Sequence, residues 1–164
     1  MTESLSTERV IAIRDLSVRF VMPDGDIDAV QHVSIEIDRG ERVALVGESG
    51  SGKSVTAASI LGLLPYPRAV HPSGSILFRG QELLGAPERA LRQVRGDRIA
   101  MIFQEPMVSL NPLHTIGKQI CETLILHKGL REAAAKERAL GLLEQVRIRD
   151  PERQFSSWPH QLSG

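Results

Sequence analysis

The chain has 164 residues, of which 41% are hydrophobic, and this suffices for one domain with an apolar core. Its 20 basic and 20 acidic side chains cancel, so no excess of positive charge points to nucleic acid. Cys121 is the single cysteine, which excludes an intramolecular disulfide, and neither a signal peptide nor a membrane-spanning run is evident, so we expect a soluble protein from a reducing compartment.

The N-terminal part of the chain has the patterns of strands separated by turns. Alternation of apolar and polar side chains predicts half-buried strands at residues 16–20 and 33–38, with a turn between them at 23–26. The purely apolar run at 43–46 predicts a strand that is buried on both faces. We therefore expect a sheet to precede the next motif.

The segment GESGSGKS, residues 47–54, has the spacing of a phosphate-binding loop. Its glycines allow successive backbone N–H groups to point into one concavity, and a helix that starts near Lys53 adds the positive end of its dipole. In this motif Lys53 reaches the outer phosphates and the Ser54 hydroxyl holds Mg²⁺. A flexible Gly/Ser linker is the alternative. The preceding apolar run and the helix-forming stretch at 54–64 favour the phosphate loop.

Strand and helix patterns continue beyond this loop. The proline-rich residues 64–74 cannot form one continuous helix, whereas residues 75–80 fit a strand that ends in a turn. A short helix with Pro87 near its start is expected at 86–95. The apolar run at 98–104 predicts a second fully buried strand.

From His114 onwards helical periodicity dominates, and residues 131–146 have the strongest helical pattern in the chain. In the first predicted helix the apolar stripe consists of Ile116, Ile120, Leu124 and Ile125, and Gly129 interrupts the pattern. In the second, the apolar face is expected to consist of Leu140, Leu143 and Val146. The organisation is therefore a β-rich lobe followed by a helical lobe.

Three stretches of this sequence resemble the nucleotide-binding subunits of ABC transporters. They are GESGSGKSVTA at 47–57, MIFQEPMVSLNPLHT at 101–115 and PHQLSG at 159–164. Within that family the sequence is most similar to the ATPases of oligopeptide and dipeptide importers, and nearest to the microcin C and oligopeptide importer ATPase. The resemblance covers residues 9–164, and the stretch at 101–115 carries the likeness to the peptide importers.

The resemblance implies an α/β fold, the ABC type of P-loop NTPase, with an N-terminal antiparallel β subdomain and an α-helical subdomain. Residues 1–104 would form the β-rich lobe with the phosphate loop and Gln104. Residues 105–164 would form the helical subdomain as far as the start of the signature motif. Together they would make up part of one nucleotide-binding domain.

The resemblance also implies the site residues. Gln104 matches the Q-loop glutamine, which implies contact with Mg²⁺ and the attacking water, so Ser54 and Gln104 are the expected metal ligands. Phe20 is expected to stack on adenine with Val30 under the same base, although a core phenylalanine is the alternative. The residues expected to contact ATP are Phe20, Gly47, Ser49, Gly50, Ser51, Gly52, Lys53, Ser54, Val55, Ser163 and Gly164.

The function implied by the resemblance is peptide import driven by binding and hydrolysis of ATP, with Mg²⁺, between two such subunits. The implied partners are the permease subunits, a second ATP-binding subunit or domain and, indirectly, a periplasmic peptide-binding protein, with no nucleic acid. The protein would lie peripherally at the cytoplasmic face of the inner membrane.

Three parts of the family pattern have no counterpart in the 164 residues: the continuation of the signature motif, the acidic strand with the Mg²⁺ aspartate and the general-base glutamate, and the switch histidine. We therefore expect an N-terminal fragment that binds nucleotide at most, with no ATPase activity of its own. Two other functions stay open. One is a soluble ABC-type ATPase of DNA repair or translation, and the other is a P-loop nucleoside kinase with the basic residues of 130–153 as its lid.

Overall fold

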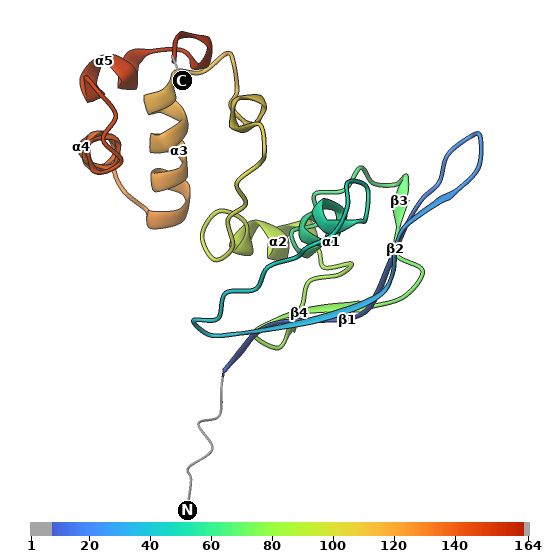
Figure 1. Ribbon diagram of the computed structural model, residues 1–164. Coiled ribbons are helices and arrows are strands. Elements are labelled where there is room, and N and C mark those ends of the chain that lie inside the picture. Colours follow the sequence, from blue (N-terminus) through green and yellow to red (C-terminus); the bar gives the residue numbers. More distant parts are fainter. Residues whose placement is uncertain (1–7, 163–164) are drawn as a thin grey trace, which may run out of the picture. The chain divides into compact units, whose positions relative to one another are not determined.

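The computed structural model describes residues 8–162, and the chain divides into two compact units, Met1–Arg95 and Gly96–Gly164. The first unit is dominated by a sheet and the second is built of helices (Figure 1). The predicted boundary between the lobes, at residues 104 and 105, falls inside the second unit.

The first unit contains a five-stranded sheet in which all pairings are antiparallel, as predicted. The strand order is β2-β1-β4-β5, and β3 pairs with the end of β1. The strands are β1 (Arg9–Phe20), β2 (Ile27–Asp38), β3 (Ala69–Val70), β4 (Ser75–Phe78) and β5 (Gln81–Glu82).

The hairpin of β1 and β2 confirms two of the predicted strands and extends both of them. The predicted turn is present, since the Gly25 N–H donates to the Met22 carbonyl over 3.2 Å. Half-buried Val33, Ile35 and Ile37 alternate with exposed residues along β2, which matches the period of a strand with one covered face.

Because β1 lies between β2 and β4, it supplies much of the core of the first unit. Ile13, Leu16 and Val18 are at most 1% exposed, and Ile76 of β4 is fully buried beside them. The predicted strand at 16–20 thus belongs to a central strand rather than to a half-buried one.

Glu82 fastens β5 to β4 through its carboxylate. It accepts hydrogen bonds from the Ser75 hydroxyl at 2.5 Å, the Ile76 N–H at 2.8 Å and the Leu84 N–H at 2.9 Å. Burial by itself raises the pKa of Glu82, but these hydrogen bonds outweigh burial and hold the pKa below its usual value.

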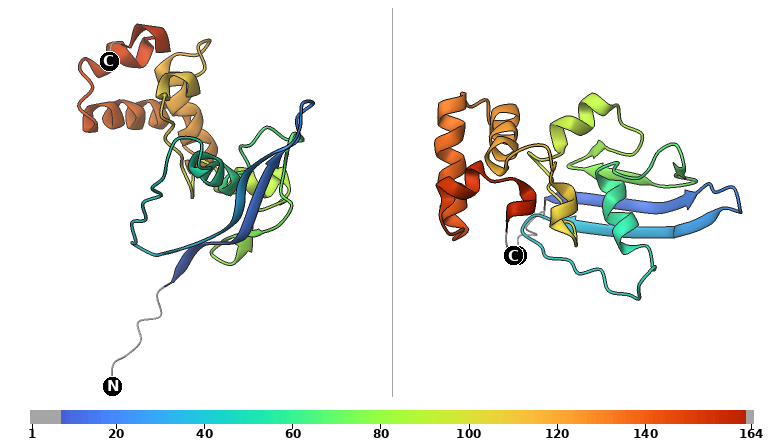
Figure 2. Two further views of the ribbon diagram at one scale, coloured as in Figure 1. Left: turned by 45° about the vertical axis from the view of Figure 1, so that its right-hand side comes forward. Right: turned by 90° about the horizontal axis from the view of Figure 1, so that it is seen from above.

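Two helices complete the first unit, α1 (Lys53–Ile60) and α2 (Glu88–Val94). Figure 2 shows α1 beside β2, which it contacts. Helix α2 confirms the helix expected at 86–95, with Pro87 as its N-cap residue.

The two predicted buried strands, at 43–46 and 98–104, are wrong for this structure. Residues 43–46 are irregular and exposed, with Val46 92% exposed, and in the second segment Ile102 is 93% exposed. An extended segment becomes a strand only when a neighbour accepts and donates its backbone hydrogen bonds. Within residues 8–162 neither segment lies in a ladder, and Ile99 makes only an isolated bridge.

The second unit confirms the helical region predicted from His114 to Val146. Helices α3 (Ile116–Lys128), α4 (Glu132–Gln145) and α5 (Pro151–Ser156) pack on one another (Figure 1). The Thr115 hydroxyl caps the start of α3, and Gly129 ends it in the left-handed conformation at φ 64°. None of the helices in residues 8–162 combines the length and the apolarity needed to cross a membrane.

The buried face of α4 differs from the predicted one. Leu143 is buried as expected, but Val146 is 67% exposed, and the rest of the buried row consists of Ala135 and Ala139. On α3, Ile116 is buried whereas Ile125 is 40% exposed, so the predicted stripe covers only part of the contact surface.

Small residues let the helices of the second unit approach closely. A side chain at Gly117 would meet the ring of Phe155 at 2.5 Å, because this ring lies directly on the α3 backbone. The Lys136 ammonium lies 5.9 Å from the centre of the same ring, within the range of a cation–π contact.

Candidate functional site

The phosphate loop leads directly into α1, as its sequence predicts. Gly50 and Gly52 adopt left-handed backbone conformations, with φ of 83° and 84°, which residues with a side chain rarely adopt. The chain turns around Gly50, where the Ser51 N–H donates to the Glu48 carbonyl at 3.3 Å, and Gly52 then serves as the N-cap residue of α1. The glycines at these two positions are therefore required by the backbone path.

Gly52 also sets how closely the loop approaches the sheet. A Cβ atom at this position would lie 2.4 Å from the Ala29 carbonyl oxygen and 3.1 Å from the Val30 Cγ2 atom. The Gly52 carbonyl in turn accepts hydrogen bonds from the Thr56 N–H at 2.8 Å and from the buried Thr56 hydroxyl at 2.9 Å. The end of the loop is thus fixed between β2 and the first turn of α1.

The Lys53 ammonium turns back over the loop. It donates to the carbonyl oxygens of Gly47 at 2.8 Å and Glu48 at 2.5 Å, and to the Ser51 hydroxyl at 3.1 Å. An ammonium has three N–H donors, so these acceptors match its full capacity. A ligand with oxygen acceptors can replace them one at a time without leaving the charge unpaired.

The same region provides donors for an anion. The N-cap residue Gly52 makes no side-chain cap to the first backbone N–H groups of α1, and the helix dipole is positive there. A Cβ atom at Gly47 would lie 2.8 Å from the Ser51 hydroxyl oxygen and 3.9 Å from the Lys53 ammonium, so glycine keeps this space free. The bare backbone, the ammonium and the exposed Ser54 hydroxyl together fit a phosphate group and its cation.

Comparison with known families shows to which family the chain with this loop belongs. The sequence profile described as ABC transporter matches residues 30–164, which is most of the chain. The chain belongs to the ABC transporter family. This membership agrees with the resemblance drawn from the loop and the stretch at 101–115.

Two relatives show which kinds of ABC transporter protein the chain is similar to. The chain is 60% identical over 159 residues to the peptidoglycan transport ATP-binding protein YejF of Agrobacterium fabrum, covering 97% of this chain and 29% of YejF. It is 45% identical over 156 residues to the oligopeptide transport ATP-binding protein OppD of Bacillus subtilis, covering 95% of this chain and 44% of OppD. The chain therefore spans less than half the length of both relatives.

Solved structures support the ABC-type fold. The chain matches the dimeric, post-hydrolysis structure of an ATP-binding cassette bound to ADP and phosphate with a TM-score of 0.79 and 25% identity. The match covers 93% of this chain and 63% of that cassette. The antiparallel sheet, the phosphate loop and the helical unit are thus parts of an ABC-type α/β fold, as predicted.

Of the other predicted site residues, Phe20 ends β1, half-buried, where it pairs with Ile27 and Ala69. Val30 lies against the position of Gly52, and therefore at the base of the loop. Gln104 is exposed in a bend of the second unit. Ser163 and Gly164 lie outside the described residues.

The structure adds two contributors that the sequence analysis did not name. The carbonyl oxygen of Ala29 limits the space beside the loop, and the Thr56 hydroxyl fixes the start of α1. Thr56 follows the motif in a helical pattern and gave a weak signal, whereas the place of Ala29 depends on how β2 packs. In residues 8–162 no group of three or more His, Cys, Asp and Glu side chains could hold a metal ion.

Proposed function

We propose that this chain is the nucleotide-binding part of an ATP-hydrolysing subunit that powers peptide import. The observation that carries the proposal is the Lys53 ammonium held over a glycine loop at the uncapped N-terminus of α1. Membership of the ABC transporter family and the similarity to proteins of oligopeptide and peptidoglycan transport support this function over other uses of a phosphate loop.

In the proposed mechanism the loop binds the phosphates of ATP by exchange. The Lys53 ammonium releases loop carbonyls and bonds to outer phosphate oxygens, while the first N–H groups of α1 and the glycine backbone bind the remaining oxygens. Mg²⁺, held by Ser54 and Gln104, would neutralise charge on the transferred phosphoryl group. Positioning and charge neutralisation are the main catalytic contributions in phosphoryl transfer.

The remaining contacts to the nucleotide belong to the same proposal. Phe20 stacks on the adenine ring beside Val30, and the small residues Ser49, Gly50 and Ser51 with Val55 line the phosphates. Ser163 and Gly164 contact the nucleotide held by a second ATP-binding subunit. The subunit works with permease subunits at the cytoplasmic face of the inner membrane.

The test is nucleotide binding by the protein and its Lys53→Ala variant, measured by titration with a fluorescent ATP analogue in the presence of Mg²⁺. We expect the variant to lose at least about tenfold in affinity, since it removes the one ammonium of the loop. Lys118→Ala is the matched control, because Lys118 lies exposed on α3 and its ammonium contacts the His114 ring, far in sequence from the loop. Equal affinities of Lys53→Ala and Lys118→Ala would refute the phosphate site.

Import is tested separately, in cells that depend on the transporter for a peptide nutrient. Lys53→Ala is expected to abolish growth on the peptide while Lys118→Ala supports it. Co-purification of the subunit with membrane permeases would exclude a DNA-repair or translation ATPase. Transfer of phosphate to a nucleoside rather than to water would instead indicate a kinase.

A further inference from the structure

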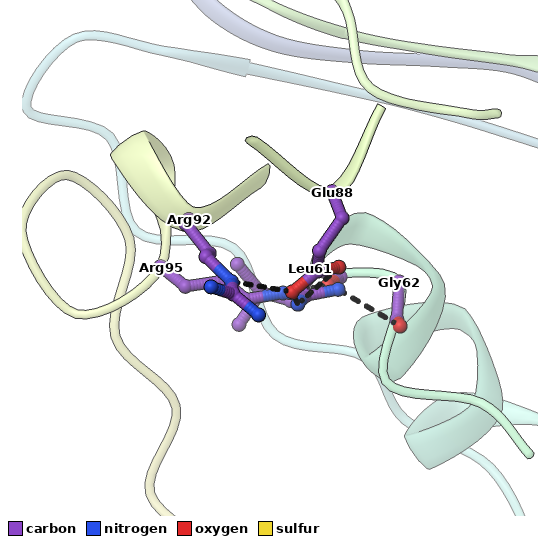
Figure 3. A network of polar contacts seen from close by, with 5 residues as sticks. All are labelled: Leu61, Gly62, Glu88, Arg92 and Arg95. Carbon is purple, nitrogen blue, oxygen red and sulfur yellow. Dashed lines mark hydrogen bonds and ion pairs between the residues drawn. The ribbon is translucent and has the colours of Figure 1, made fainter. Parts of the chain in front are cut away.

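The C-terminal end of α1 is held by one side chain, that of Arg95. Its Nε donates to the Leu61 carbonyl at 2.6 Å, and one Nη donates to the Gly62 carbonyl at 3.1 Å (Figure 3). The other Nη donates to both carboxylate oxygens of Glu88 at 3.1 Å each. The planar guanidinium thus bridges the end of α1 and the start of α2.

These two carbonyls belong to the first two residues after α1. The Gly62 N–H donates to the Ser59 carbonyl at 3.1 Å and the Leu63 N–H donates to the Ala58 carbonyl at 3.0 Å, the arrangement of a Schellman motif. That motif pairs the carbonyls of Ala58 and Ser59 in the last turn of the helix. Arg95 bonds the carbonyls of the C-cap residue Leu61 and of Gly62, at the negative end of the helix dipole.

Val55, Ala57, Ala58 and Ile60 of α1 are half-buried, and the fully buried positions of this helix carry hydroxyl side chains. Its buried residues are Thr56 and Ser59, and both hydroxyls donate to carbonyls of the same helix. Short hydroxyl side chains bury little apolar surface, so they contribute little to the position of the helix on the sheet. The two ends of α1 add fixed contacts to this packing, with Gly52 against β2 at the first end and buried Leu61 with Arg95 at the second.

A shift at one end of α1 reaches the other. An α-helix of eight residues is about 12 Å long and keeps its backbone hydrogen bonds when it moves, so it moves as a body. Lys53 and Ser54 stand at the opposite end from Arg95. If Leu61 and Gly62 can move, the Lys53 ammonium and the first N–H groups of α1, which bind phosphate in the proposed mechanism, move with them.

We propose that Arg95 is a positioning residue for the nucleotide site, which acts through the C-terminal end of α1 and is itself held in place by Glu88. This inference rests on the proposed function for its ligand, ATP. Arg95 touches neither the phosphate loop nor Lys53 in the contacts described, so its effect is indirect and pre-organises the loop.

Arg92 offers a matched control on the same helix. Its Nε donates to the Glu88 carboxylate at 3.0 Å, and its side chain is 76% exposed (Figure 3). Like Arg95→Ala, Arg92→Ala removes one positive charge and one arginine partner of Glu88. It leaves the hydrogen bonds from Arg95 to the Leu61 and Gly62 carbonyls in place. A second control, Ile76→Val, destabilises the sheet core of the first unit at β4, whereas the strand that α1 mainly contacts is β2.

The first experiment measures the affinity for Mg-ATP and the melting temperature of the protein and these variants. We expect Arg95→Ala to weaken binding by about tenfold, because two charge-assisted hydrogen bonds that fix the helix are lost. Arg92→Ala and Ile76→Val should stay within about twofold of the unchanged protein. Arg95→Lys should fall between, since the ammonium keeps the charge but lacks the planar fork that bonds both carbonyls and Glu88 at once.

The second experiment follows hydrogen exchange of the backbone amides of residues 47–55 without nucleotide. Arg95→Ala should speed exchange there, and Ile76→Val should not at an equal loss of melting temperature. If affinity and loop exchange merely follow melting temperature across all variants, or if Arg95→Ala matches Arg92→Ala, Arg95 is not a positioning residue. Should Arg95→Ala fail to fold, Glu88→Gln and Arg95→Lys are compared in its place, with the same outcomes decisive.

These results separate the inference from the function on which it rests. Loss of binding in Lys53→Ala supports the phosphate site whatever Arg95 does. If the unchanged protein does not bind ATP, the proposed function fails, and the exchange experiment still shows whether Arg95 orders the loop.

Discussion

Gly50 and Gly52 share one backbone conformation but differ in the space around them, and this makes them a test of how the phosphate loop is held. Their φ angles are 83° and 84°. A Cβ atom at Gly50 would meet no atom within 4 Å, whereas at Gly52 it would lie 2.4 Å from the Ala29 carbonyl oxygen. Alanine at both positions therefore separates the cost of conformation from the cost of crowding.

The two costs can be worked out from the structure. A left-handed residue with a side chain costs about 1–2 kcal/mol relative to glycine. Alanine also restricts the unfolded chain, which returns about 0.4–1 kcal/mol at both positions. At Gly52 an ordinary contact begins near 3.4 Å, so the loop or β2 must move by about 1 Å. Such overpacking costs about 1–3 kcal/mol more.

The difference between the variants is measured by thermal and urea unfolding of the protein without nucleotide. We expect Gly52→Ala to be less stable than Gly50→Ala by about 1–3 kcal/mol, which corresponds to a melting temperature lower by at least about 2 °C for a chain of this length. Equal stabilities would show that the loop does not pack against β2 as described. A larger loss in Gly50→Ala would mean that the space around that residue is filled.

Two further predictions concern turnover and pH. In the intact transporter, Gln104→Ala should reduce steady-state phosphate release at least about tenfold, while the affinity for ATP changes by less than about threefold. The reason is that in the proposed mechanism the neutral amide adds little to phosphate binding but orients Mg²⁺ and water. Equal losses of phosphate release and of ATP affinity would contradict this role. The folded pKa of Glu82 lies below its unfolded value of about 4.3, so its contribution to stability is present above that pH and is lost as the pH falls through the folded pKa. Urea unfolding between pH 7 and 3 should therefore show the gap between the protein and Glu82→Gln closing at low pH, and a constant gap would exclude the hydrogen-bonded carboxylate.

Local sequence signals predicted those elements whose hydrogen bonds are made nearby. The turn at 23–26, the capped helix α3 and the loop before Lys53 all depend on residues a few positions apart, and each is present. Helix capping by Thr115 and termination by Gly129 are of this kind.

Features that depend on distant neighbours could not be predicted in the same way. Residues 43–46 have a strong strand pattern, but a strand needs a partner, and none of the described residues pairs with them. On α4 the apolar pattern predicted that Val146 is buried, whereas in the packed helices Ala135 and Ala139 are buried and Val146 is exposed. The distance to the neighbouring helix limits the size of the side chain at a helix contact, and the periodicity of one helix contains no information on that distance.

At the candidate site the sequence predicted the residues that would bind phosphate better than the residues that hold them in position. The glycine spacing, Lys53 and Ser54 follow from the needs of a phosphate group and are recognisable in isolation. The fork of Arg95 on Leu61 and Gly62 joins segments 33 or more positions apart. No short pattern marks that contact, because it arises only once α1 and α2 are folded beside the same turn.

The exposed apolar segment at 43–46 determines how this polypeptide behaves at high concentration. Its backbone N–H and C=O groups are outside any ladder, and its side chains are uncharged, with Val46 almost fully exposed. Two copies that meet there can form a strand pair between molecules, in competition with the productive contacts of a single molecule. We therefore expect aggregation of this polypeptide to rise steeply with its concentration, because each such contact needs two molecules.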